Sequence, residues 1–433
     1  MPVAINSTIA FDKVSKDVYK IQQNREKDTL MLDSQTISIV KQTAPILAPK
    51  AEELTRLFYK QLFENNPEVK PYFNQAHQFS GGQQRALAGA IVAYATHIDQ
   101  LDQLGSHVDL IAHKHVSLGI EPEHYPIVGQ NLLAAIKELL GEQASDQVID
   151  AWAKAYGLLA QIMIDHEKGI YQKHDQDHGG RGFREFYVID KVVESDEITS
   201  FYLKPSDGSV PSPHLAGQYI TLRLAFEGQT TMRNYSLSCA PGSSAYRISV
   251  KRETAREGHI PDGVVSNHLH DCIQVGDQLE VAPACGNFTL TTDRQVNRPL
   301  VLLSGGVGVT PVLSMLHAAV KQQDAGDIWF IHAARNTSVH AFDQEVRQLA
   351  EKHSNLNMLF CYDEPAGSDR PHCQHGRIDQ ALLKQLLPGA DADFYFCGPK
   401  PFMKSIYRAL NDWGVPEEQI HFEFFGPVDD LKN

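Results

Sequence analysis

The spacing of apolar residues divides the chain into parts with different patterns. Over residues 31–173 the apolar residues recur every three or four positions, as in Leu54, Leu57, Phe58 and Leu62, and strand-like alternation is almost absent. Such spacing places apolar side chains on one face of a helix. The pattern predicts an all-α domain.

The chain then changes to short runs in which apolar and polar residues alternate, separated by turn residues. Several short strands of this kind in succession favour an antiparallel barrel or sandwich. We predict an antiparallel β-barrel domain over residues 183–292, preceded by a polar, glycine-rich linker at residues 174–182. The expected strands are residues 186–193, 199–203, 219–224, 246–251 and 278–281.

The last part, residues 293–433, alternates wholly apolar runs with helical stretches. Strands that are apolar at every position are buried on both faces, which is typical of a parallel sheet between helices. We therefore predict an α/β domain. Its expected strands are residues 300–303, 328–332, 358–361 and 394–396.

Residues 1–30 fit none of these patterns. They lack the apolar core of a secretory signal, and their acidic residues argue against a transit peptide. Val14, Val18 and Ile21 would share one face of a short helix, but a disordered tail is the favoured interpretation. We predict an N-terminal extension.

Length and composition narrow the class of protein. A chain of 433 residues suits about three domains. Its formal net charge of −14 disfavours nucleic acid and anionic membranes, because both need a concentrated basic surface. No apolar run is long enough to span a membrane, and no two Cys have the C-x-x-C spacing of a zinc ribbon, a redox dithiol or covalently attached haem. We expect a cytoplasmic monomer that acts on small molecules.

One histidine stands out as a possible metal ligand. On the helix expected from Ser106 to Leu118, Ile111, Ala112 and His115 share a face, whereas His113 lies about 200° from His115. An inward histidine is more often a core residue than a ligand. Both interpretations stay open from this helix alone.

A carboxylate in an apolar stripe adds a second signal. Tyr156, Leu159, Met163 and Glu167 fall on one face of a long helix. A lone buried carboxylate is costly, so Glu167 needs a partner or must reach solvent at the helix end. A metal-bound imidazole that donates its second N–H is one such partner, with Tyr125 as a candidate third member.

Several short motifs, in this order, resemble the globin domain of flavohemoglobins. The motifs are Leu57-Phe58-Tyr59, Asn66-Pro67-Glu68, Phe73, Gln83, Leu87, His113-Lys114-His115, Tyr125 and residues 151–157. The resemblance implies a non-covalent haem b whose iron is bound by His115. It implies cofactor contacts from Phe73, Leu87 and Lys114, and catalytic roles for Tyr59, Gln83, Tyr125 and Glu167.

The resemblance places Tyr59 and Gln83 on the distal side of the haem. A tyrosine hydroxyl there can donate to bound O₂ and stabilise its partial negative charge. Taken alone, Tyr59 is equally compatible with a core aromatic residue.

Two motifs in the barrel part suit a flavin nucleotide. In the strand-like run around Arg233-Asn234-Tyr235-Ser236, Arg233 and Tyr235 project to one side, offering a cation and an aromatic plane, while Ser236 adds a hydroxyl. Residues 263–266 open a short helix whose N-terminal amides can hold a phosphate. The simpler alternatives are an exposed strand pair and a serine cap.

Two further motifs lie in the α/β part. Residues 301–311 read as a buried strand, a glycine turn and a helix starting near Pro311, which lets a pyrophosphate approach the backbone. The turn is not G-x-G-x-x-G. Residues 394–399 form another buried strand followed by a tight turn, Cys397-Gly398-Pro399, at the sheet edge where ligands bind.

These four elements, in this order, resemble the ferredoxin–NADP⁺ reductase superfamily, and the ending at residues 422–427 is similar to its flavohemoglobin branch. The resemblance implies that FAD contacts Tyr219, Arg233, Asn234, Tyr235, Ser236, Gly263, Val264, Val265, Ser266, Glu423, Phe425 and Gly426. It implies that NAD(P)H contacts Gly305, Gly306, Val307, Gly308, Val309, Thr310, Pro311, Cys397, Gly398 and Pro399.

Arg335 follows the expected strand at residues 328–332, where an acidic residue favours NADH and a basic one NADPH. The arginine favours NADPH, with both nucleotides expected to work. A solvated loop cation is the alternative.

The function implied by the resemblance is that of a nitric oxide dioxygenase, which oxidises NO with O₂ to nitrate at a haem re-reduced by NAD(P)H through FAD. Two alternatives remain: a diaphorase that reduces flavins, ferric iron or quinones, and an oxygen-binding or oxygen-sensing globin attached to a reductase.

Overall fold

The computed structural model describes residues 32–73, 82–101, 105–177, 180–226, 228–254, 263–291, 298–322, 326–364 and 371–425. The extension expected at residues 1–30 lies outside them. The described residues divide into two compact units, one drawn from residues 1–67, 87–106 and 121–166 and the other from the rest of the chain. No helix of the described residues is long and apolar enough to cross a membrane.

The first unit is helical, as the spacing of apolar residues predicts. Within α3, Leu54, Phe58 and Leu62 are buried on one face. The helices are joined by buried polar contacts: the Trp152 indole donates to Thr43 Oγ1 at 2.9 Å, and the Tyr94 hydroxyl donates to a backbone carbonyl at 2.7 Å. Its helices are α2 (Ser34–Leu47), α3 (Ala51–Asn65), most of α5 (Gly82–Thr96), α7 (His124–Leu140) and most of α8 (Asp146–Gln176).

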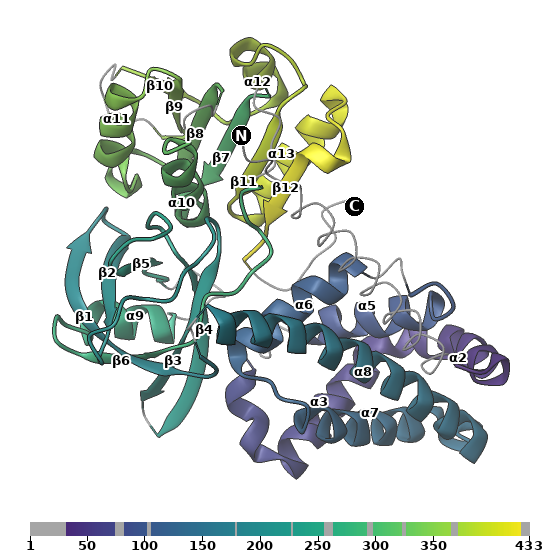
Figure 1. Ribbon diagram of the computed structural model, residues 1–433. Coiled ribbons are helices and arrows are strands. Elements are labelled where there is room, and N and C mark those ends of the chain that lie inside the picture. Colours follow the sequence, from purple (N-terminus) through teal and green to yellow (C-terminus); the bar gives the residue numbers. More distant parts are fainter. Residues whose placement is uncertain are drawn as a thin grey trace, which may run out of the picture. The chain divides into compact units, whose positions relative to one another are not determined.

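The second unit contains α6 (Gly105–Leu118) from His107 onward, the last turns of α8, and two sheet domains (Figure 1). The first sheet is antiparallel, with strand order β4-β3-β6-β1-β2-β5. The chain just after β4 pairs with β5 through a bridge between Leu237 and Ile248, so the sheet closes into the predicted barrel. Its elements are β1 (Arg184–Val193), β2 (Ile198–Pro205), β3 (Tyr219–Phe226), β4 (Gln229–Ser236), β5 (Tyr246–Lys251), α9 (Val264–Asp271) and β6 (Gln278–Val281).

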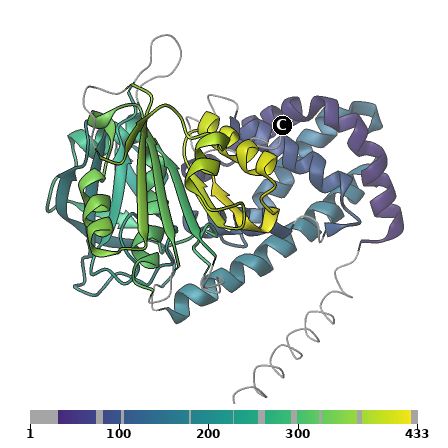
Figure 2. The ribbon, with the colours of Figure 1, turned by 90° about the horizontal axis from the view of Figure 1, so that it is seen from above.

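The second sheet is parallel, with order β10-β9-β8-β7-β11-β12. Helices α10 and α11 pack on one face and α12 and α13 on the other, which buries the strands as predicted (Figures 1 and 2). Its elements are β7 (Leu300–Gly305), α10 (Val309–Ala319), β8 (Ile328–Ala334), α11 (Asp343–Lys352), β9 (Leu356–Tyr362), β10 (Cys373–His375), α12 (Gln380–Leu386), β11 (Asp393–Cys397), α13 (Lys400–Trp413) and β12 (Ile420–Glu423).

Three differences from the sequence-based expectations concern element ends and short strands. Helix α8 continues to Gln176, three residues into the expected linker, and His174 Nε2 there donates to the Ala284 carbonyl at 3.1 Å. Strands β10 and β12, which are three and four residues long, are not among the expected strands. Helix α10 begins at Val309, two residues earlier than expected.

The strand order of the parallel sheet reverses between β7 and β11. From β7 the chain adds β8, β9 and β10 on one side, and then returns to place β11 and β12 on the other. In open α/β sheets, ligands bind beyond the carboxyl ends of the strands at such a point. The glycine turn after β7 and the turn after β11 both lie there.

Candidate functional site

The structure brings together the histidine and the buried carboxylate singled out in the sequence. His115 Nδ1 lies 2.8 Å from Glu167 Oε1, and Glu167 is 2% exposed. Because an ionised carboxylate only accepts, Nδ1 carries the proton and Nε2, at the opposite edge of the ring, is the atom suited to bind a metal. The arrangement fits a histidine ligand held and made more basic by a second residue.

The other face of α6 is turned to the barrel. His113 Nδ1 accepts from the Gly286 amide at 3.2 Å, and the Asn287 side chain donates to Asp109 at 2.7 Å. His113 and His115 therefore face different partners from α6, as their helical spacing predicts. The helix that carries His115 is anchored to the flavin-type barrel.

Three expected haem residues belong to the first unit. Tyr59 on α3 is 5% exposed, with its ring centroid 4.9 Å from that of Phe58. Tyr125 is buried, and its carbonyl accepts from the Tyr156 hydroxyl at 2.7 Å. Leu87 is half-buried on α5.

Phe73, Gln83 and Lys114, which are also expected at the haem, fall in the second unit together with His115 and Glu167. Phe73 is half-buried, whereas the side chain of Gln83 lies outside the described residues. The grouping of all these residues around one haem stays a prediction.

A polar cluster lies between α6 and the sheet domains of the second unit. The Glu423 carboxyl at the end of β12 has its pKa raised to about 7 by burial, an effect partly offset by the Lys114 ammonium. Burial in turn lowers the pKa of Lys114, while Glu423 raises it. Glu423 Oε2 and the Tyr219 hydroxyl are buried and have no hydrogen-bond partner among the described residues. Such orphaned polar atoms fit a polar ligand such as a flavin ring.

The strand motif has the alternation expected of a flavin-binding strand. Arg233 and Tyr235 are half-buried on β4, and Arg233 Nη1 is held by Thr231 Oγ1 at 2.8 Å and a backbone carbonyl at 2.7 Å. Burial lowers the pKa of the Arg233 guanidinium, partly offset by Tyr235. Ser236 is buried and Asn234 is exposed. The strand presents a fixed cation and an aromatic ring on one side.

The start of α9 also suits a phosphate group. No side chain caps its first turn, because the Ser266 hydroxyl donates instead to the Gly263 carbonyl at 3.1 Å and accepts from the Glu253 amide. The serine-cap alternative is therefore not what the structure shows. A Cβ at Gly263 would lie 2.6 Å from Ser266 Oγ, so only glycine fits. Val265 is buried and Val264 is 60% exposed.

The two turns at the strand-order reversal pack backbone against backbone. A Cβ on Gly308 would lie 2.3 Å from the Cys397 carbonyl oxygen, and one on Gly398 would lie 2.6 Å from the Phe402 ring. The Thr310 hydroxyl donates to the Val307 carbonyl at 3.0 Å, which fixes the turn before α10. This close approach leaves a cradle of backbone suited to a dinucleotide pyrophosphate.

The last expected residues lie next to the ends of β8, α13 and β12. Arg335 is exposed but forms an ion pair with Glu197, so it is not simply a solvated cation. Pro399 precedes α13, and Phe425 is 44% exposed. Gly426 lies outside the described residues.

Sequence reasoning missed a cluster that joins the two sheet domains. Arg247 on β5 donates to both carboxylate oxygens of Glu345 on α11 at 2.8 and 3.0 Å, and His317 on α10 lies 2.5 Å from the same carboxylate. The sequence offers no signal for this cluster, because Arg247 occupies a polar position of the alternating strand at residues 246–251. Its partner is 98 positions away and could not be identified.

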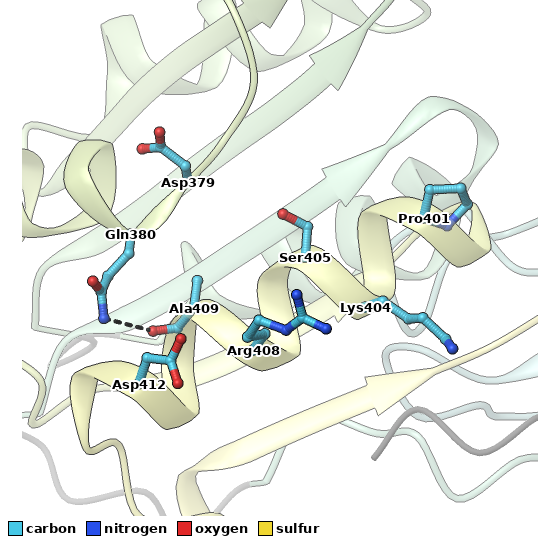
Figure 3. Close-up of a pocket in the computed structure, with 8 residues that line it drawn as sticks. All are labelled: Asp379, Gln380, Pro401, Lys404, Ser405, Arg408, Ala409 and Asp412. Carbon is cyan, nitrogen blue, oxygen red and sulfur yellow. Dashed lines mark hydrogen bonds between the residues drawn. The ribbon is translucent and has the colours of Figure 1, made fainter. Parts of the chain in front are cut away.

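A separate cleft of about 360 Å³ lies between α12 and α13 (Figure 3). Asp379 and Gln380 line one side, and Lys404, Arg408 and Asp412 line the other. None of the residues expected at the haem, flavin or nucleotide sites lies in it.

Three family models match successive parts of the chain. The Globin family matches residues 56–163, the Oxidoreductase FAD-binding domain matches residues 186–290, and the Oxidoreductase NAD-binding domain matches residues 302–408. Their order agrees with the three predicted folds.

Named relatives match almost the whole chain. It is 49% identical to the Flavohemoprotein of Rhodopirellula baltica over 409 residues, covering 93% of this chain and 99% of the relative. It is 47% identical to the Flavohemoprotein of Halalkalibacterium halodurans over 409 residues, with the same coverage.

Two solved structures are also similar. A flavohemoglobin from Malassezia yamatoensis with bound FAD and heme superimposes with a TM-score of 0.79 at 26% identity, covering 91% of this chain and all of that one. The FAD/NAD-binding domain of a nitric oxide dioxygenase from Vibrio cholerae gives a TM-score of 0.52 at 37% identity, covering 57% of this chain and all of that one.

Proposed function

Because the chain belongs to the flavohemoprotein family, we propose that it is an NAD(P)H-dependent nitric oxide dioxygenase that oxidises NO with O₂ to nitrate. One NAD(P)H supplies two electrons, so two NO and two O₂ yield two nitrate ions, NAD(P)⁺ and one proton. The observation that carries the proposal is the 2.8 Å contact between His115 and the buried Glu167.

The three cofactors divide the chemistry. When bound, haem supplies an iron for O₂ and NO, NAD(P)H supplies electron pairs, and FAD converts pairs into single electrons. The domain boundaries that we propose are those predicted from the sequence, with haem, FAD and nucleotide domains in chain order. We also propose a cytoplasmic monomer whose substrates are O₂ and NO.

On the proximal side, Glu167 would hold the His115 ring in one orientation. A carboxylate on Nδ1 makes Nε2 a stronger donor, which pushes electron density onto the metal. Strong donation favours reactive oxygen chemistry over reversible storage. Lys114 and Phe73 would lie at the haem edge and face.

On the distal side, we propose that the Tyr59 hydroxyl donates a hydrogen bond to O₂, with Gln83 and Leu87 completing the pocket. Tyr125 would support the proximal pair. The buried position of Tyr59 on α3, within the segment that the Globin family matches, supports this role.

Between haem and nucleotide, the expected flavin contacts are Tyr219, the β4 motif and the first turn of α9. Lys114, whose charge acts on Glu423, directly precedes His115 on α6. The Glu423 carboxyl, whose pKa is raised to about 7 by burial, would hold or release a proton at Oε2 near neutral pH beside the flavin.

Rapid mixing of the oxygenated protein with NO tests the proposal. We expect loss of the oxygenated spectrum at a rate proportional to NO concentration, with nitrate formed in equal amount. If the oxygenated spectrum persists while NO remains, the proposal fails and a diaphorase with an oxygen-binding globin remains.

A Tyr59→Phe variant tests the distal assignment. Loss of a hydrogen bond to a partly charged acceptor should speed O₂ dissociation about tenfold. Tyr94→Phe is the matched control, because it removes another buried hydroxyl that donates only to a backbone carbonyl. Equal O₂ dissociation in wild type and Tyr59→Phe would remove Tyr59 from this role.

A further inference from the structure

The choice between NADH and NADPH depends on one atom group, the 2′ position of the adenosine ribose. In dinucleotide-binding sheets a residue after the second strand reads this position, where an acidic side chain suits a 2′-hydroxyl and an arginine suits a 2′-phosphate. Strand β8 is the second strand of the nucleotide domain, and Gly305 of the glycine turn is in register with Ala333 on it. Arg335 follows β8 directly, on the same edge as the glycine turn.

The guanidinium of Arg335 is already paired. Its Nη2 forms an ion pair with the carboxylate of Glu197, which belongs to the flavin domain and lies in the connection between β1 and β2. The Arg335 side chain is 54% exposed, so a nucleotide can still reach it. The carboxylate of Glu197, which belongs to a different domain, is therefore paired with the guanidinium that would bind a 2′-phosphate.

The position of Glu197 is fixed by its backbone. Its carbonyl accepts from the Arg252 amide at 2.7 Å, which ties it to the end of β5. The neighbouring Asp196 amide donates to the Ser338 carbonyl at 3.0 Å, so the β1–β2 connection is docked on the loop that carries Arg335. The ion pair is thus one of several contacts between the β1–β2 connection and the loop after β8.

We infer that Glu197 is a specificity-determining residue: by neutralising Arg335, it lowers the preference for NADPH and lets the protein use both nucleotides. A 2′-phosphate must share or displace the Glu197 carboxylate, whereas a 2′-hydroxyl meets no such competition. The inference rests on the proposed use of NAD(P)H and is independent of the reaction with NO.

The effect of removing the Glu197 charge follows from the exposure of the pair. Exposed ion pairs are weak, so Glu197→Gln should strengthen 2′-phosphate binding by about two- to fivefold. NADH and other nucleotides without the 2′-phosphate should bind unchanged. In an Arg335→Ala background Glu197→Gln should have no effect, because the competition requires both residues.

The test uses the FAD-containing full chain and needs no NO. The affinities for adenosine 2′,5′-bisphosphate and for adenosine 5′-monophosphate are measured by calorimetry. The KM values for NADPH and NADH are measured from the rate of ferricyanide reduction. Glu197→Gln should tighten the bisphosphate and lower the NADPH KM by the same factor, while Arg335→Ala raises the NADPH KM more than the NADH KM. Glu185→Gln, which removes an exposed charge at the opposite end of β1, is the control.

Three results would overturn the inference. The first is an equal change in affinity for the bisphosphate and the monophosphate in Glu197→Gln. The second is the same gain in bisphosphate affinity when Glu197→Gln is made in the Arg335→Ala background. The third is an equal gain in bisphosphate affinity in Glu185→Gln. Failure of the proposed dioxygenase activity would leave all these measurements interpretable, since ferricyanide reduction does not involve NO.

Discussion

Two imidazole–carboxylate pairs in this protein have similar geometry and different surroundings. His115 lies 2.8 Å from Glu167, and His317 lies 2.5 Å from Glu345. The Glu167 side chain is 3% exposed and the Glu345 side chain 28%. Glu345 also receives both arms of the Arg247 guanidinium, a permanent cation.

This difference in surroundings separates two roles. Burial alone would raise the pKa of Glu345, but hydrogen bonds from His317 and Arg247 outweigh it and bring the pKa to about 2. Glu345 is therefore the charged centre of an ion-pair cluster with Arg247 and His317 that joins the flavin and nucleotide domains. We call this cluster the latch. Glu167 faces an imidazole on the helix matched to a globin, where its hydrogen bond can tune a ligand. The His317–Glu345 pair thus stabilises a contact between domains, whereas the His115–Glu167 pair, in our proposal, serves the chemistry of the iron.

The largest expected effect breaks the latch. Arg247→Ala leaves the partly buried Glu345 carboxylate without its permanent cation, which should cost about 3 kcal/mol in the free energy of unfolding. Urea unfolding followed by flavin fluorescence should show a lower midpoint, with the O₂-bound absorption spectrum unchanged. An unchanged midpoint would show that the Arg247 latch does not stabilise the fold.

The latch also has a pH signature. The pKa of Glu345 is lowered from 4.5 to about 2, so its stabilisation is complete above pH 4.5 and is lost as the pH falls through about 2. Wild type should therefore lose more stability than Glu345→Gln between pH 4.5 and 2. Parallel acid-unfolding curves for the two proteins would contradict the assignment.

The next effect should appear on the other pair. Glu167→Gln keeps the size of the side chain but removes the charge behind His115, and should lower turnover with NO about 10- to 100-fold. The iron–histidine stretching frequency of the ferrous protein should fall, and ferricyanide reduction by NAD(P)H should be unchanged. Glu345→Gln is the matched control and should leave that frequency unaltered, so an equal shift in both variants would remove the distinction between the pairs.

The smallest expected effect concerns Glu423. Its pKa of about 7 means that the carboxyl is ionised and attracts Lys114 above neutral pH, and is neutral below it. We expect the rate of haem reduction by the flavin to change about threefold between pH 6 and 8. That change should vanish in Glu423→Gln. A pH profile that survives the substitution would assign it to another group.

Local patterns predicted most of the fold and the parts of the site that lie within single elements. The apolar spacing predicted α3 and α6, and the position of Glu167 in an apolar stripe correctly indicated that it needs a partner. The glycine turn after β7 and the tight turn after β11 were each expected, whereas the close packing of Gly308 on Cys397 is seen only in the structure.

Contacts between distant parts of the chain could not be predicted. Arg335 and Glu197 are 138 positions apart, and no periodicity or spacing relates them. The same holds for Arg247 and Glu345. A strand of three residues such as β10 is too short to show alternation, and it forms because β9 offers a free edge to pair with.

The most direct test of the central claim is the fate of the oxygen atoms. The protein is supplied with NAD(P)H, NO and ¹⁸O₂, and the nitrate formed is analysed by mass spectrometry. The account predicts nitrate in which both atoms of one O₂ molecule appear together, at a ratio of two nitrate ions per NAD(P)H consumed. Nitrate carrying a single labelled atom, or NAD(P)H consumption without nitrate, would contradict it.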